Sequence, residues 1–294
     1  MLCSGNVAGS DWLSSPLLLD GAMGTALIAR GLDLAQAPPD LWSIERPEEV
    51  RAVHNRYIEA GCGALTTNSF GANGARLARY GLAAQVDAIN LAAASAARDC
   101  APAGVRVLGS IGPSGAVPPP EGDANLHELE DLFAEQAAAL AAGKVDALLI
   151  ETFYHPKELR AALRGCRAGA PDLPVIASFA CKRVGSDGFA TSMGFAVEAM
   201  VGVALEESAD SLGINCALLP DDMVPLIRRL AERTQRPLLA QPIISSMTGP
   251  PLFPEEFAAG VAALFEAGAR LVGGCCGTSP TDLAAAHDAL ALDR

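Results

Sequence analysis

Positively charged residues are scarce in this sequence. Lysine and arginine together number 21 against 34 acidic residues, the formal net charge is -13 at pH 7, and no run of lysines or arginines forms a basic patch. A surface of this charge repels phosphate backbones and anionic lipids. We therefore expect no nucleic-acid partner and no membrane partner.

Long apolar runs and an export signal are also missing. No apolar stretch reaches the roughly 18 residues that a membrane-spanning helix needs. Residues 1–15 contain neither the basic region nor the continuous apolar region of a signal peptide. We therefore expect a cytoplasmic protein whose eight cysteines are thiols, because disulfides are rare in reducing compartments.

Apolar residues, by contrast, make up 50% of the 294-residue chain, enough for a large core. Short apolar runs alternate with amphipathic stretches, which is the pattern of buried parallel strands joined by helices. The runs that we predict to be strands are residues 17–20, 64–68, 105–112, 146–151, 175–179, 210–216, 237–241 and 270–275. The stretches that we predict to be helices are residues 47–61, 86–100, 126–142, 156–168, 196–208, 221–232 and 255–267.

Eight such units favour a closed barrel over an open sheet. A (β/α)8 barrel needs eight strands and commonly forms from about 250 residues, whereas an open doubly wound sheet rarely needs eight even units. We therefore predict an α/β fold, a single-domain (β/α)8 TIM barrel over residues 1–294 with its core at about 16–292. Residues 112–125 and 182–191 are predicted to be long irregular loops after strands, where barrels keep their active sites.

Three cysteines follow predicted strands. Cys275 and Cys276 are neighbours in a glycine-rich segment after one apolar run, and Cys216 ends another. If both runs are strands of one parallel barrel, they open on the same face. Three thiolates that meet at one point suit Zn²⁺ with a fourth position left for water or substrate. We therefore predict a zinc site at these three residues.

Other polar residues end strands on the same face. Asp20 and Glu151 each follow an apolar run and either pair with the ammonium of an amino-acid substrate or cap the next helix. Asn68 either holds a polar group of the substrate or caps a turn. Asn215 is interpreted as orienting the loop that carries Cys216.

The remaining cysteines and the histidines show no ligand spacing. We interpret five cysteines as structural or incidental: Cys3, Cys62, Cys100, Cys166 and Cys181. We interpret the four histidines, which lie within or beside predicted helices, as solvated: His54, His127, His155 and His287.

Six motifs, in order along almost the whole chain, carry a resemblance to a known family. They are Leu19-Asp20-Gly21-Ala22-Met23-Gly24-Thr25, Leu65-Thr66-Thr67-Asn68-Ser69-Phe70-Gly71-Ala72-Asn73, Gly109-Ser110-Ile111-Gly112-Pro113, Ile150-Glu151-Thr152-Phe153, Gly213-Ile214-Asn215-Cys216 and Gly273-Gly274-Cys275-Cys276-Gly277-Thr278. With these motifs in place, the chain resembles the homocysteine S-methyltransferase family.

The resemblance implies a zinc-dependent (β/α)8 barrel that methylates the thiol of homocysteine to give methionine. It implies that Cys216, Cys275 and Cys276 hold the zinc and that Asp20 and Glu151 lie in the homocysteine pocket. We add Gly21, which shapes the backbone, and Asn68 as candidate substrate-binding residues. Small-molecule substrates, homocysteine and a cationic methyl donor, are then the expected partners, and the sequence predicts no oligomeric state.

One segment departs from the family pattern. Where relatives carry Pro-Asn-Ala/Ser-Gly after the seventh strand, this chain has Gln241-Pro242-Ile243-Ile244-Ser245-Ser246. Apolar side chains thus replace a polar one near the expected substrate mouth, so recognition of substrate or donor differs there.

The donor follows from the chemistry of the expected site. A methyl group leaves readily from a sulfonium or a quaternary ammonium, and such cations are drawn to a negatively charged thiolate site. Chains of this size resemble family members that use S-methylmethionine or S-adenosylmethionine, so we expect one of these donors. Betaine or another donor, and another thiol or selenol acceptor, are alternatives within the family.

Two alternatives lie outside the family. One is a metal-free barrel hydrolase that uses Asp20 and Glu151 as a carboxylate pair, although three tyrosines and two tryptophans offer little surface for stacking on sugars. The other is a non-catalytic zinc-binding or thiol-sensing module, which a fourth protein ligand or a Cys275–Cys276 disulfide would favour.

Overall fold

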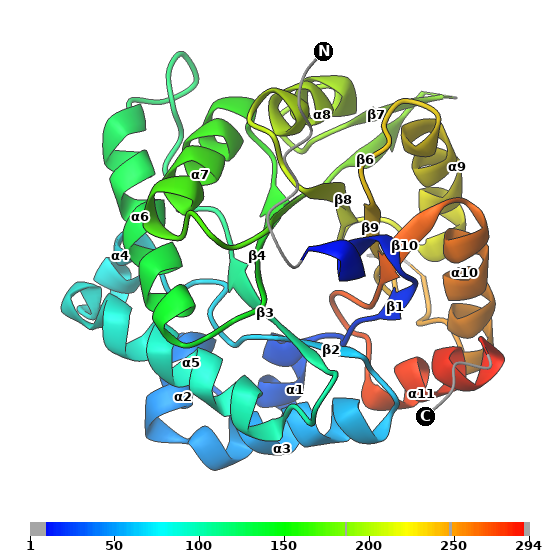
Figure 1. The fold of residues 1–294 in the computed structure, drawn as a ribbon, viewed down its shortest axis with the longest axis horizontal. Helices are drawn as coiled ribbons and strands as arrows, with labels where there is room; N and C mark the ends of the chain where they lie inside the picture. The colour runs from blue at the N-terminus through cyan, green and yellow to red at the C-terminus, as the bar shows by residue number, and fades with distance from the viewer. Residues whose placement is uncertain (1–9, 186, 247–248, 291–294) are drawn as a thin grey trace.

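The fold is an eight-stranded parallel sheet that closes on itself inside a ring of helices (Figure 1). The computed structural model describes residues 10–185, 187–246 and 249–290. The strands of the sheet are β1 (Leu17–Leu18), β2 (Ala64–Thr66), β3 (Arg106–Ile111), β4 (Ala147–Phe153), β5 (Val175–Phe179), β8 (Ser211–Asn215), β9 (Leu238–Gln241) and β10 (Ala269–Val272).

The strands follow one another around the ring in chain order. β1 pairs with β10, and a parallel bridge between Leu19 and Ala64 joins β1 to β2. The Asp20 N–H, next along the chain, donates to the Ala64 carbonyl at 3.1 Å. The ring is thereby completed, and the predicted (β/α)8 TIM barrel is confirmed.

Alternate strand residues serve two cores. In β4, Ala147 and Leu149 belong to the cluster inside the barrel, whereas Leu148 and Ile150 pack in the cluster beneath the helices. All four are fully buried, which is why the strands read as continuous apolar runs rather than alternating ones. Leu13, from the 3-10 turn η1 (Asp11–Ser14), fills the N-terminal end of the barrel interior.

The helices form the outer ring, and all seven predicted ones are present. The helices are α1 (Met23–Ala29), α2 (Trp42–Glu45), α3 (Pro47–Glu59), α4 (Gly74–Leu77), α5 (Val86–Cys100), α6 (Leu126–Ala142), α7 (Pro156–Gly169), α8 (Val197–Glu206), α9 (Pro220–Ala231), α10 (Pro254–Glu266) and α11 (Pro280–Ala289). We did not predict α11, although its start carries a signal: Ser279 N–H and Oγ both donate to Asp282 at 2.7 Å, a capping box that satisfies the helix start.

The two long segments predicted as irregular loops differ. Residues 112–125 contain no helix or strand, so that prediction is confirmed. The prediction for residues 182–191 is wrong, because β6 (Lys182–Val184) and β7 (Gly188–Ala190) form an antiparallel hairpin there. All residues of β6 are exposed, and in β7 only Phe189 is buried, so the hairpin shows no run of alternating apolar residues in the sequence.

The interpretation of the histidines as solvated is wrong for three of the four. His54, His155 and His287 are buried, and only His127 is exposed. His155 Nδ1 accepts from Lys157 N–H at 3.1 Å and so caps α7, while His287 lies against Gly61. Burial lowers the pKa of His54 to about 4, because a charged imidazole would lose its hydration.

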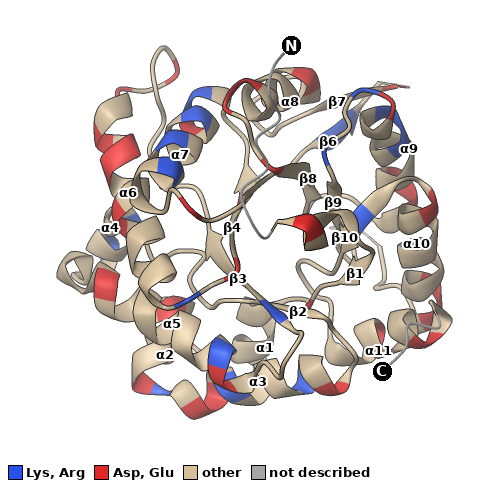
Figure 2. Ribbon diagram, viewed as in Figure 1, with Lys and Arg blue, Asp and Glu red and all other residues tan. Residues whose placement is uncertain are grey.

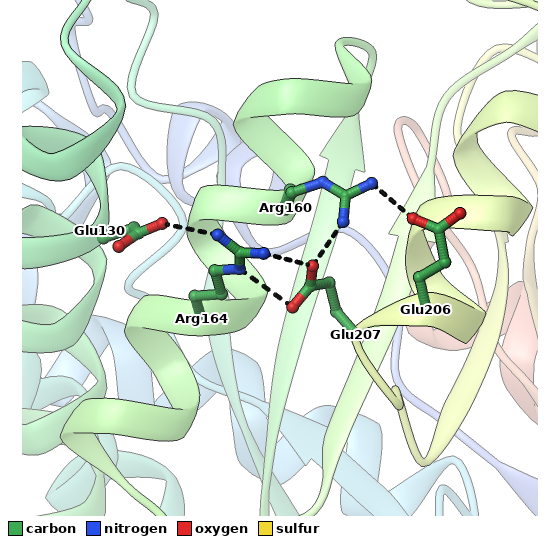
Figure 3. A network of polar contacts seen from close by, with 5 residues as sticks. All are labelled: Glu130, Arg160, Arg164, Glu206 and Glu207. Carbon is green, nitrogen blue, oxygen red and sulfur yellow. Dashed lines mark hydrogen bonds and ion pairs between the residues drawn. The ribbon is translucent and has the colours of Figure 1, made fainter.

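Charged side chains lie mostly on the outer helices (Figure 2). Figure 3 shows one network in which Arg160 and Arg164 of α7 both contact Glu207, the residue directly after α8. Glu206 and, from α6, Glu130 complete it. Three neighbouring helix units are thus linked on the surface. Within the part of the chain that the structure describes, no helix is long and apolar enough to cross a membrane.

Candidate metal centre

Three cysteine sulfurs meet at the C-terminal end of the barrel. The Sγ atoms of Cys216, Cys275 and Cys276 all lie within 4.8 Å of one another, and those of Cys216 and Cys276 are 3.7 Å apart. Cys216 directly follows β8, and the other two follow β10. β9 lies between these strands, so cysteines from its two neighbours converge above its end, as the sequence predicted.

The backbone around the cluster is tied to the end of β9. Cys216 N–H donates to the Gln241 carbonyl at 2.9 Å, and Cys275 N–H donates to the Pro242 carbonyl at 2.8 Å. Cys216 and Ala217 have φ angles of 60° and 57°, a left-handed conformation that non-glycine residues rarely adopt. The chain therefore turns sharply at Cys216, which a strand continuing in extended geometry would not do.

Thr278 packs closely against two glycines and joins the loop that carries Cys275 and Cys276 to the loop after β1. Thr278 Oγ1 donates to the Cys275 carbonyl at 2.7 Å and accepts from Ala22 N–H at 3.1 Å. A Cβ atom on Gly21 would lie 2.5 Å from Thr278 Oγ1, and one on Gly274 would lie 2.3 Å from it. These two glycines are required because any side chain would push the loops apart.

Asn215 is buried at the end of β8 and connects three parts of the site. Its Oδ1 accepts from Thr152 N–H and from Ser178 Oγ, both at 2.8 Å, and its Nδ2 donates to Thr152 Oγ1 at 2.7 Å. Nδ2 also lies 3.9 Å from Cys275 Sγ. The side chain therefore reaches Cys275 and the end of β4, whereas the sequence interpretation assigned it to the Cys216 loop.

The two predicted acids lie near the cluster but in different settings. The N–H and the hydroxyl of Thr66 each donate to one carboxylate oxygen of Asp20, both at 2.8 Å. Asp20 is fully buried behind Thr66. Glu151 accepts from Ser110 Oγ and lines the cavity described below. Burial raises the pKa of each carboxyl to about 7, because the charged form loses hydration.

Gly21 and Asn68 also line the cavity. Asn68 Nδ2 donates to the Pro39 carbonyl at 2.7 Å and to Ser43 Oγ at 3.2 Å. Its amide group therefore holds the segment around α2 against the loop after β2. These are contacts between distant parts of the chain, and they do not decide between the two roles that we weighed for Asn68.

A cavity of about 570 Å³ opens beside the sulfurs, a size typical of small-molecule sites. Its wall combines the cysteines and Glu151 with Met23, Phe70 and Tyr80, and Arg76 and Arg79 line it as well. Gln241 is the residue of β9 that reaches this wall. Beyond it, Ile243 N–H donates to the Leu218 carbonyl at 3.0 Å, and Ile244 packs beside Gly277.

The thiols influence one another's protonation. Hydrogen bonds with Cys216 and Cys275 lower the pKa of Cys276, whereas hydrogen bonds with Cys216 and Cys276 raise the pKa of Cys275. Repulsion between closely spaced thiolates is what a divalent cation removes. Three convergent sulfurs beside an open cavity are therefore a donor set that fits a soft or borderline metal ion such as Zn²⁺, with room for a further ligand.

Comparison with known proteins agrees with this geometry. The family model described as "Homocysteine S-methyltransferase" matches residues 17–290. The chain belongs to the homocysteine S-methyltransferase family. The matched region contains β8 and β10 and all three cysteines that follow them.

Two curated mycobacterial proteins are similar to this member of the homocysteine S-methyltransferase family. The methionine synthase of Mycobacterium tuberculosis is 31% identical over 296 residues, covering 93% of this chain and 24% of that protein. The methionine synthase of Mycobacterium leprae is 31% identical over 283 residues, covering 89% of this chain and 23% of that protein. The chain spans about a quarter of the length of these curated relatives.

A solved structure of similar length also belongs with this family. The homocysteine methyltransferase MmuM from Escherichia coli, in its metallated form, has 28% identity and a TM-score of 0.76, covering 93% of this chain and 96% of that one. Its oxidized form gives 29% identity and a TM-score of 0.75, covering 92% and 94%. The carboxyl transferase domain of Rhizobium etli pyruvate carboxylase, at 17% identity and a TM-score of 0.52 over 90% of this chain and 41% of that one, shares the fold alone.

Proposed function

We propose that this chain transfers a methyl group from a sulfonium donor, S-methylmethionine or S-adenosylmethionine, to the thiol of L-homocysteine and so forms methionine. Cys216, Cys275 and Cys276 would hold Zn²⁺ at the barrel mouth. The observation that carries the proposal is that their sulfurs lie within 4.8 Å of one another beside a cavity that admits a small molecule. The family membership and the metallated form of MmuM support it.

Zinc bound at this site would supply the nucleophile by holding the substrate sulfur in its deprotonated form, with the thiol proton released to solvent. The methyl carbon then forms a bond to that sulfur while its bond to the donor sulfur breaks, and the donor leaves as a neutral thioether with the bonding electron pair. Because the leaving group needs no proton, we assign no general acid. The protein must chiefly align the two substrates.

Glu151 is the residue proposed to bind the ammonium of homocysteine. It lies in the cavity wall and is held in place by Ser110. An incoming ammonium would favour its charged form against the burial that raises its pKa. Asp20, behind Thr66, would add negative potential, and Gly21 would bring the main chain to the substrate.

The two alternatives outside the family have less support. A carboxylate-pair hydrolase needs both acids in the cavity, but both oxygens of Asp20 are already bound to Thr66. A purely structural zinc site needs a fourth protein ligand. Among the described histidine, cysteine and acidic residues, the cluster has three members.

The test is a donor panel analysed by mass spectrometry. Zinc-loaded protein is incubated with isotopically labelled homocysteine and unlabelled S-methylmethionine, S-adenosylmethionine or betaine, because S-methylmethionine itself leaves unlabelled methionine. Labelled methionine with either sulfonium supports the proposal. Labelled methionine with betaine alone would show that betaine, and not a sulfonium, is the donor. No methyl transfer with any donor, by protein shown to contain zinc, would overturn it. The control variant Cys100→Ser should retain methyl transfer, because Cys100 is also partly buried but lies on α5, outside the cluster.

A further inference from the structure

Gln241, at the end of β9, has a buried polar atom without a partner. Its side chain is 4% exposed, and among the described residues with an unpartnered buried oxygen or nitrogen it alone lines the cavity. The atom is the carboxamide oxygen Oε1. An unpaired buried carbonyl costs free energy that a ligand would recover by pairing with it.

Several other polar side chains of the cavity wall are paired within the protein. The pairs are Thr66 with Asp20, Thr67 with Ser69, Asn68 with Ser43, Ser110 with Glu151 and Thr152 with Asn215. Gln241 differs from these side chains because its Oε1 is buried without a partner.

The position of Gln241 limits which part of a ligand can reach it. Its carbonyl binds Cys216 N–H, and the next carbonyl, of Pro242, binds Cys275 N–H. The residue therefore lies between the two cysteine segments, at the place where the reacting sulfur would be.

The chemistry of the two substrates then selects one partner. Homocysteine carries no N–H group next to its sulfur, since two methylene groups separate the sulfur from the carbon that bears the ammonium. A sulfonium donor, in contrast, carries its positive charge at the reacting centre and polarises the C–H bonds attached to it. A carbonyl oxygen attracts such a cation and accepts weak hydrogen bonds from those C–H groups.

We propose that Gln241 Oε1 recognises the sulfonium centre of the methyl donor. This inference rests on the proposed function. As the methyl group moves to homocysteine, the donor becomes a neutral thioether and the attraction to Oε1 is lost. Gln241 would therefore distinguish the charged donor from the neutral product and favour release of the product.

Binding measured by calorimetry on zinc-loaded protein tests this. The main probes are S-methylmethionine, which is cationic, and methionine, its neutral thioether counterpart with the same amino-acid group. Homocysteine and S-adenosylmethionine are titrated as well. Wild type should bind S-methylmethionine more tightly, and Gln241→Met, which keeps the size but removes the oxygen, should reduce this preference about tenfold with little change in methionine affinity. Gln241→Glu retains an oxygen and should keep or increase the preference, which also covers the case in which Gln241→Met fails to fold.

Gln235→Met is the matched control, because Gln235 is exposed and precedes the same strand at the opposite end of the barrel. It should leave both affinities unchanged. An unchanged preference in Gln241→Met would overturn the inference, as would weaker binding of homocysteine with the donor preference intact, which would assign Gln241 to the amino acid. If wild type itself binds no sulfonium, the proposed function fails rather than this inference alone.

Discussion

Asn215 and Thr152 hold each other through two hydrogen bonds: Thr152 N–H donates to Asn215 Oδ1 at 2.8 Å, and Asn215 Nδ2 donates to Thr152 Oγ1 at 2.7 Å. Thr152 has a φ of 66°, a strained angle for a β-branched residue. The pair therefore fixes the backbone directly after Glu151 and places an amide beside Cys275 Sγ. One buried side chain thus couples the acid and the sulfur cluster.

Asn215→Leu should weaken zinc binding by about 10- to 100-fold, because the groups that orient metal ligands act on affinity to this extent. Titration against a chelator of known affinity measures the change. Ser178→Ala is the comparison, since it removes one contact to Asn215 Oδ1 and leaves the contacts to Thr152 and Cys275 intact, so a smaller loss is expected. Equal zinc affinity in wild type and Asn215→Leu would show that Asn215 has no part in orienting the ligands.

Gly274→Ala should destabilise the protein by about 1–3 kcal/mol, because the new methyl group would lie 2.3 Å from Thr278 Oγ1 and overpack a tight contact. Urea unfolding measures the change. Gly202→Ala is the control: this glycine lies within α8 with nothing within 4 Å of the added atom, and alanine should stabilise the helix by up to about 1 kcal/mol. Similar effects of the two substitutions would contradict the packing described around Thr278.

His54 should make the protein sensitive to acid. Burial lowers its pKa from 6.5 to about 4, so between these values the unfolded chain takes up a proton that the folded chain does not. Stability is full above pH 6.5 and falls as the pH decreases towards 4, by up to about 3 kcal/mol for this residue. His54→Met should flatten the fall in the free energy of unfolding between pH 7 and pH 4.

His127→Met is the matched control for this measurement, because the His127 side chain is 80% exposed. It should leave the pH dependence unchanged. If both histidine variants lose stability with acid as steeply as wild type, another group controls the acid response.

Glu207→Gln should lower the free energy of unfolding by about 1 kcal/mol at low salt, because Glu207 binds two arginines of α7 at once (Figure 3) and networks contribute more than single exposed pairs. The loss should shrink in 1 M NaCl. Asp99→Asn, in an isolated exposed pair with Arg51, should change stability by only a few tenths of a kcal/mol. A loss independent of salt would point to packing rather than charge.

The strands and the three cysteines could be predicted from the sequence because their signals are local. A strand buried on both faces reads as an apolar run, and the polar or sulfur-bearing residue that ends it marks the C-terminal face of a barrel. Cys216 and Cys276, 60 residues apart, could be placed together for this reason. The hairpin of β6 and β7 lacked such a signal because β6 is exposed and a single residue of β7, Phe189, is buried.

The partners of each side chain could not be predicted, because they come from distant parts of the chain. Thr66 binds Asp20, Asn215 reaches Thr152, and Thr278 contacts Ala22. Nothing local marks these pairs. Gln241 lay within the segment that departs from the family pattern, but only the structure shows that its oxygen is buried without a partner.

The most direct test of the account is X-ray absorption at the zinc edge, with and without homocysteine. We predict three sulfur neighbours in the zinc-loaded protein, contributed by Cys216, Cys275 and Cys276, and four once homocysteine is added. Each single cysteine-to-serine substitution in the cluster should remove one sulfur neighbour or abolish zinc binding. Fewer than three sulfurs in the wild-type protein, or a sulfur count that homocysteine leaves unchanged, would contradict the claim that these thiols hold the metal that activates the substrate.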